Sequence, residues 1–93
     1  MKMSLRRYGI LLKKYLKEVK PMKYIQLIID GTLMDYLLEE EKYLYEFSYI
    51  IRLYLKDTYS EPKTHEFILI FKYNQMIDSM VEEFVRNEIT KIV

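Results

Sequence analysis

Apolar residues recur at spacings of three and four from the start of the chain, which is the period of a helix with one buried face. The first such stretch predicts an amphipathic helix over residues 4–20, with Ser4 as its N-cap. Gly9 lies inside this helix and costs it about 1 kcal/mol relative to alanine. A close approach between the backbone there and a neighbouring group would explain the glycine.

Pro21 marks the end of the first helix, because proline disfavours helical backbone in the preceding residue and suits the first turn of a new helix. A short second helix is therefore expected over residues 21–30. Gly31 follows it as a C-terminal cap residue with positive φ. Thr32, with an acid three positions later, is typical of a helix start and predicts a long third helix over residues 33–57.

The last part of the chain contains one loop-like cluster, residues 57–64, in which Pro62 suits the start of a fourth helix over residues 62–91. Residues 67–71 read Phe-Ile-Leu-Ile-Phe, which is compatible with a buried strand on β-propensity alone. No partner strand is evident nearby, and the chain has only 2 glycines and 2 prolines, so we predict helix. The expected fold is an all-α bundle in a single domain, residues 1–93, with helices at 4–20, 21–30, 33–57 and 62–91.

The charge of the chain is strongly divided along its length, although the net charge is only +1. Residues 1–24 carry eight lysines and arginines against Glu18 alone, whereas residues 25–93 carry thirteen acids against seven basic residues. Such asymmetry indicates an anionic partner for the basic N-terminal segment. Packing of this basic segment against acidic helices of the same fold is the alternative explanation.

Residues that would carry out catalysis or hold a metal do not form a recognisable pattern. The chain has no cysteine, and its single histidine, His65, has no adjacent nucleophile or metal-ligating partner. Consecutive acids such as Glu39, Glu40 and Glu41 point about 100° apart on a helix and do not converge. We therefore predict no enzymatic activity, no metal and no cofactor. The apolar runs fall short of the ~20 residues of a membrane span, so we expect a cytoplasmic protein without a membrane partner.

Tyrosine is unusually frequent, with ten residues in the chain, several of them beside lysine or arginine. Aromatic rings among cations are typical of surfaces that stack on bases while the charges meet phosphates. Tyrosine is also enriched at protein interfaces, because it combines apolar area with a polar tip. A coding bias in an AT-rich gene would raise the tyrosine content without any functional reason.

Several short motifs follow one another along the chain, namely Arg7-Tyr8-Gly9, Lys14-Tyr15-Leu16-Lys17-Glu18, and then Tyr24, Leu27, Gly31, Leu33 and Leu37. Their order resembles the transposon-encoded protein TnpV family. The resemblance continues in Asn74-Gln75-Met76, Val85-Arg86-Asn87 and Ile92-Val93, and is weak through residues 40–73. The resemblance implies a small accessory protein of a bacterial mobile genetic element and supplies no biochemical mechanism.

Our first hypothesis is that the chain binds a nucleic acid or a nucleoprotein complex through its basic N-terminal helix. Clustered cations on one helix are the expected electrostatic footprint of such binding. The candidate contacts are Arg6, Arg7, Lys13, Lys14, Lys17, Lys20 and Lys23.

Two alternatives involve protein partners. The chain could inhibit a host defence protein, in the manner of an anti-CRISPR protein, through acidic and tyrosine-rich helix faces. The candidate residues for that role are Glu39, Glu40, Glu41 and Glu46. A homodimer formed through the long third helix is the other alternative.

Overall fold

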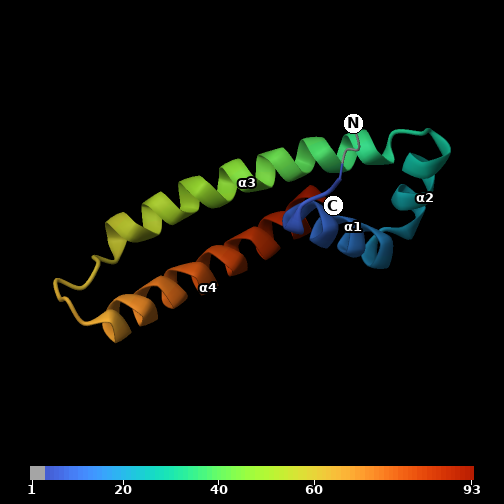
Figure 1. The fold of residues 1–93 in the computed structure, drawn as a ribbon. Helices are drawn as coiled ribbons and strands as arrows, with labels where there is room; N and C mark the ends of the chain where they lie inside the picture. The colour runs from blue at the N-terminus through green and yellow to red at the C-terminus, as the bar shows by residue number, and fades with distance from the viewer. Residues whose placement is uncertain (1–3) are drawn as a thin grey trace.

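A computed structural model describes residues 4–93 as four helices, and no strand occurs in this range. They are α1 (Arg7–Val19), α2 (Pro21–Ile29), α3 (Leu33–Thr58) and α4 (Phe67–Ile92). The two long helices α3 and α4 run antiparallel as a hairpin, while α1 and α2 lie at the end away from the connecting loop (Figure 1). The described part of the chain is therefore elongated, with extents of 55 × 30 × 19 Å. The prediction of an all-α fold with a long third helix is confirmed.

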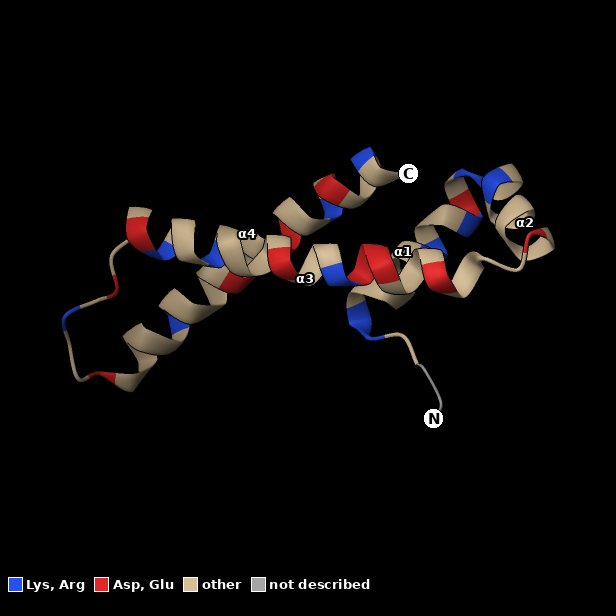
Figure 2. Ribbon diagram, turned by 90° about the horizontal axis from the view of Figure 1, so that it is seen from above, with Lys and Arg blue, Asp and Glu red and all other residues tan. Residues whose placement is uncertain are grey.

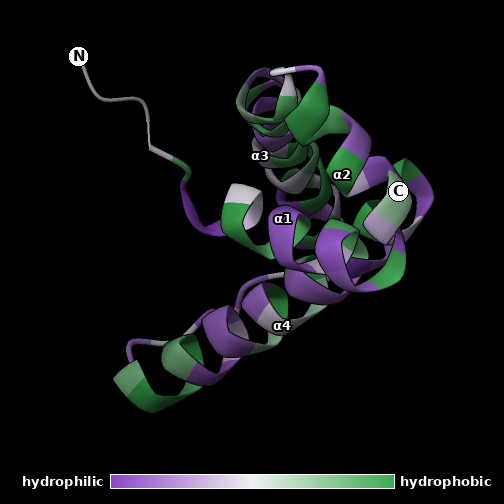
Figure 3. Cartoon of the chain, turned by 90° about the vertical axis from the view of Figure 1, so that its right-hand side faces the viewer, coloured by the Kyte–Doolittle hydropathy of each residue, from purple (hydrophilic) through white to green (hydrophobic). Residues whose placement is uncertain are grey.

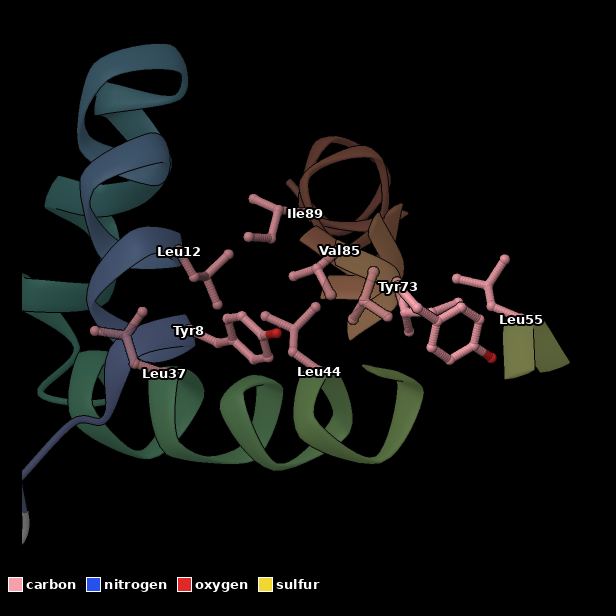
Figure 4. Close-up of a cluster of buried hydrophobic side chains, with 10 residues drawn as sticks. Tyr8, Leu12, Leu37, Leu44, Leu55, Tyr73, Val85 and Ile89 are labelled. Atoms are coloured by element: carbon pink, nitrogen blue, oxygen red, sulfur yellow. The ribbon is translucent and has the colours of Figure 1, made fainter. Parts of the chain in front are cut away.

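The hydrophobic core is formed by three of the four helices (Figure 4). α1 contributes Tyr8 and Leu12, and α3 contributes Leu37 and Leu44. α4 contributes a residue at every fourth position, namely Tyr73, Ile77, Val81, Val85 and Ile89. Residues four apart advance by about 40° around a helix, so this row turns gradually around α4. Figure 4 shows Tyr73 beside Leu55 near the loop, and Val85 and Ile89 beside α1.

The second helix is held loosely, because it contributes no buried side chain. Met22 and Ile29 are 78% and 71% exposed. The loop end of α4 is hydrophobic (Figure 3). Phe67 and Ile68 in this part of the helix are 78% and 65% exposed. The buried side chains thus lie in the middle of the fold, and apolar side chains remain exposed at both ends.

Helix ends follow the sequence signals only in part. Gly31 has φ +71°, as predicted for the residue that ends α2. Thr32 is the N-cap of α3, but its side chain makes no capping hydrogen bond. Ser4 is not the N-cap of α1, because the helix begins three residues later than predicted and Arg6 occupies the cap position.

The fourth helix also begins later than predicted, at Phe67 and not at residue 62. The segment before it is irregular, and the Thr64 hydroxyl accepts a hydrogen bond from the Glu66 backbone N–H at 3.1 Å. Such a local side-chain bond offers the backbone an alternative to the helix, which explains the late start. Residues 67–71 are helical, as expected. The Tyr73 hydroxyl donates to the Tyr59 carbonyl at 2.5 Å and ties the loop end of α4 to the end of α3.

Candidate nucleic-acid interface

The N-terminus of α1 is held by a buried carboxylate from α3. Glu41 is 4% exposed, and its Oε2 accepts a hydrogen bond from the Arg6 backbone N–H at 2.6 Å. Its Oε1 lies 3.4 Å from Arg6 Nε. The first N–H groups of a helix lack partners within the helix, and the positive end of the helix dipole favours an anion there. Glu41 therefore supplies the cap that no side chain of α1 provides.

This carboxylate accounts for Gly9. A Cβ atom at position 9 would lie 2.1 Å from Glu41 Oε2, far inside van der Waals contact. Only glycine lets the carboxylate reach the first turn of α1 without a clash. The close approach that we expected from the sequence is thus an approach by a side chain of α3.

A second ion pair joins α1 to α4. An Nη of Arg7 lies 2.6 Å from Glu82 Oε2, and the Tyr8 hydroxyl donates to Glu82 Oε1 at 3.3 Å. Burial of Tyr8, together with the charge of Glu82, raises the pKa of its phenol above the usual 10.0. The phenol therefore stays protonated as a donor throughout the neutral range. We call the set Arg6, Arg7, Tyr8, Glu41 and Glu82 the three-helix junction.

Tyr45 of α3 packs against Tyr8 and Arg6 of the three-helix junction. Its ring centroid lies 4.5 Å from that of Tyr8, and the guanidinium of Arg6 lies 4.0 Å from the Tyr45 centroid. A cation over an aromatic face is attracted by the ring quadrupole. Both arginines that the sequence suggested as nucleic-acid contacts therefore have partners within the fold, although their side chains are 63% and 68% exposed.

The lysines of the basic segment are placed differently from the arginines. The salt bridges among residues 4–93 involve Arg6, Arg7 and Arg52 on the basic side, and no lysine. Four of the five lysines at the end of α1 and in α2 are exposed, and the first is half-buried. We call this set the lysine surface: Lys13, Lys14, Lys17, Lys20 and Lys23.

The position of the lysine surface follows from the helix period. Leu12 and Leu16 of α1 are fully buried, and the lysine after each of them lies about 100° away around the helix, so Lys13 is half-buried and Lys17 exposed. The ammonium of Lys23 lies 5.0 Å from the centroid of Tyr36 in α3. Figure 2 shows the cations of α1 and α2 at one end of the molecule, with acidic bands along α3. The structure thus gathers five cations around the connection of α1 and α2.

The acidic residues suggested for a protein interface have unequal positions. Glu39 and Glu46 are exposed, Glu40 is half-buried, and Glu41 is buried in the three-helix junction. Sequence analysis missed the role of Glu41 in the fold, although the spacing of this residue indicates a buried position. It lies four residues after Leu37 and three before Leu44, on the same stripe as these core residues.

Comparison with known proteins identifies the family. A model of the family described as transposon-encoded protein TnpV matches residues 1–90. The chain belongs to the TnpV family. Neither a curated protein nor a solved structure matches the chain.

The match confirms the resemblance seen in the sequence and places this TnpV family member in a mobile genetic element. Part of that resemblance rested on Arg7, Tyr8 and Gly9, and these residues form the contacts of α1 with Glu82 and Glu41. In this chain, the Arg-Tyr-Gly motif therefore has a structural role that the geometry explains directly.

Neither a metal-binding cluster nor a membrane-spanning helix occurs among residues 4–93. Within residues 4–93, no group of three or more His, Cys, Asp or Glu side chains converges in a way that could hold a metal ion. His65 lies exposed in the loop before α4. In the same range, no helix is both long and apolar enough to cross a bilayer.

Proposed function

We propose that this TnpV family member is a non-enzymatic accessory protein of its transposon that binds nucleic acid, alone or within a nucleoprotein complex, through the lysine surface. The observation that carries the proposal is the contrast between arginines and lysines at this end of the fold. Arg6 and Arg7 are neutralised by Glu41 and Glu82, whereas the lysine surface has no ion pair among the described residues.

A surface with closely spaced, unpaired cations favours a polyanion as its binding partner. Lys13 and Lys17 are four residues apart, which corresponds to about 6 Å along a helix, well within the Debye length of about 8 Å at physiological salt. Glu18 is the single acid among residues 13–23. Lysines that meet phosphates release condensed counterions, and this release drives association with DNA or RNA.

The chemistry of the surface also suggests the kind of binding. Lysine contacts phosphate as a point charge, whereas the bidentate reading of bases is typical of arginine and of amide side chains. Because Arg6 and Arg7 pair with acids and the other cations of this segment are lysines, we expect contacts mainly with the backbone of the nucleic acid. Such contacts position a protein on its partner and carry little sequence information. The acids of the alternative hypothesis are less well placed, since Glu41 is buried and paired.

The experiment compares two triple variants with the same change of charge. Lys13, Lys14 and Lys17 are replaced by Gln in the first variant, and the exposed Lys56, Lys63 and Lys72 in the matched control. Binding to a labelled DNA duplex and to an RNA of equal length is measured by fluorescence anisotropy at about 50 mM salt. We expect the first variant to lose at least tenfold in affinity, and the control to lose about twofold. Failure of the wild-type chain to bind either probe, or equal losses in both variants, would refute the proposal.

A further inference from the structure

The α3–α4 hairpin has two broad faces, and α1 covers one of them. On this covered face, Tyr45 of α3 and Glu82 of α4 both contact Tyr8 of α1. Residues two positions apart on an α-helix lie about 200° apart around the axis. Phe47 and Phe84, each two positions beyond a residue that contacts α1, therefore point to the opposite face of the hairpin.

That opposite face is apolar along both helices. On α3, the row of apolar residues that includes Phe47 has successive spacings of four, three and four, which keeps it on one side of the helix. Met76 and Phe84 extend the same face onto α4, eight residues apart. We call this surface the open face: Tyr43, Phe47, Ile50, Tyr54, Met76 and Phe84.

The pairing of α3 with α4 makes the open face continuous. Arg52 lies level with Asp78, because an Nη of Arg52 is 2.5 Å from the Asp78 carboxylate. In an antiparallel pair, a step forward on one helix matches a step backward on the other. Tyr54 is therefore level with Met76, and Phe47 is nearly level with Phe84.

Five of these six side chains are largely accessible, and Phe47 is half-buried against the core. Ile50 and Tyr54 are 63% and 61% exposed, and Tyr43, Met76 and Phe84 are each between 40% and 44% exposed. Since a large side chain offers about 150–250 Å², the six residues present on the order of 500 Å² of apolar surface. A patch of this size is at the upper end of what monomeric proteins expose and is often functional.

We propose that a second copy of this chain packs on the open face, so that two α3–α4 hairpins form an antiparallel four-helix bundle. Spacings of three and four are the pattern of helices that pack side by side in such bundles. The apolar residues of the open face have this spacing on α3, and α4 adds further apolar side chains beside them. The open faces of two copies can therefore pack against each other around a twofold axis. In each copy, α1 lies on the far side of the hairpin and does not obstruct the contact.

The area of the open face fits a second copy. A stable interface buries about 800 Å² on each partner, of which the apolar part is roughly 60%. The apolar surface of the six residues, on the order of 500 Å², supplies that part. The exposed acids Glu46, one turn before Ile50, and Glu83, next to Phe84 in the sequence, border the face. The same two acids disfavour an anionic lipid surface as the occupant.

Sedimentation of the full chain tests the proposal, with two matched variants. Ile50→Glu places a charge at the centre of the open face, and Ile10→Glu makes the same change on α1, where Ile10 is 58% exposed. At about 50 µM chain, we expect the wild type and Ile10→Glu to sediment at twice the 11.5 kDa mass of one chain. Ile50→Glu should sediment at the mass of one chain and keep its helical circular dichroism, because the residue lies outside the core.

Each of the following results would overturn the proposal. A wild-type chain that sediments at 11.5 kDa would show that no stable dimer forms. An Ile50→Glu variant that stays dimeric, or an Ile10→Glu variant that becomes monomeric, would show that association uses another surface. A monomeric wild type that floats with anionic vesicles, with flotation lost in Ile50→Glu, would identify a lipid surface as the occupant. Nucleic-acid binding is measured independently, so either proposal can fail alone.

Discussion

At the scale of single residues, the most informative pair is Gly9 and Glu41. Burial of a carboxylate is costly unless its oxygens are hydrogen-bonded, and Glu41 meets this condition through the backbone and side chain of Arg6. The cost in helix propensity at Gly9 is offset by the cap that Glu41 provides to α1. The sequence shows each residue separately as an exception to its helix pattern, and only the structure shows that the two exceptions have one cause.

Replacement of Gly9 tests this explanation. Alanine is the better helix former by about 1 kcal/mol, so a helix without tertiary contacts would be stabilised by Gly9→Ala. We expect the opposite here, a loss of roughly 1–3 kcal/mol in the free energy of unfolding, because the new methyl group displaces the Glu41 carboxylate. Urea denaturation followed by circular dichroism measures this loss.

The matched control is the same replacement in a Glu41→Ala background. Removal of the carboxylate leaves room for the methyl group, so Gly9→Ala should then be neutral or stabilising. Equal losses in both backgrounds would mean that Glu41 is not the reason for the glycine.

At the scale of the helices, the apolar period predicted all four elements, and helix ends were harder to predict. Gly31 was predicted correctly because positive φ is nearly specific to glycine. Ser4 and Pro62 were misleading, because many serines and prolines occur outside caps. The true start of α1 depends on Glu41, which is 35 residues away from Arg6 in the chain. The residues around the start of α1 therefore contain no signal for a cap that comes from another helix.

The loop end of the hairpin depends on one hydrogen bond, from the Tyr73 hydroxyl to the Tyr59 carbonyl. Tyr73 is 8% exposed and the bond is partly buried, so Tyr73→Phe removes the donor and leaves the Tyr59 carbonyl without this partner. We expect a loss of about 1 kcal/mol in stability and faster amide hydrogen exchange around residues 58–67. Tyr49→Phe, at a site that is 64% exposed, serves as the control and should change neither quantity. Similar exchange rates in both variants would argue against a role for this bond.

At the scale of the whole molecule, the basic N-terminal segment contains two groups of cations with different surroundings. Packing within the fold explains the arginines, whereas an anionic partner for the lysines stays a prediction. The arginines pair with acids of α3 and α4, as expected if the basic segment packs within the fold. The lysines have no such pairs among the described residues, which is why we propose them as the contacts for an external anion. Charge counting predicted the segment, but the division within it depends on which cations reach Glu41 and Glu82 in three dimensions.

The salt dependence of nucleic-acid binding tests the proposed function most directly, because it counts the phosphates that the lysines neutralise. Each contact with duplex DNA contributes about −0.9 to the slope of log K against log salt concentration, so five lysines predict a slope of about −4.5. Replacement of Lys13, Lys14 and Lys17 by Gln should bring the slope to about −2, and the Lys56, Lys63 and Lys72 control should keep the wild-type value. A wild-type slope near zero, or the same slope in all three proteins, would contradict binding through the lysine surface.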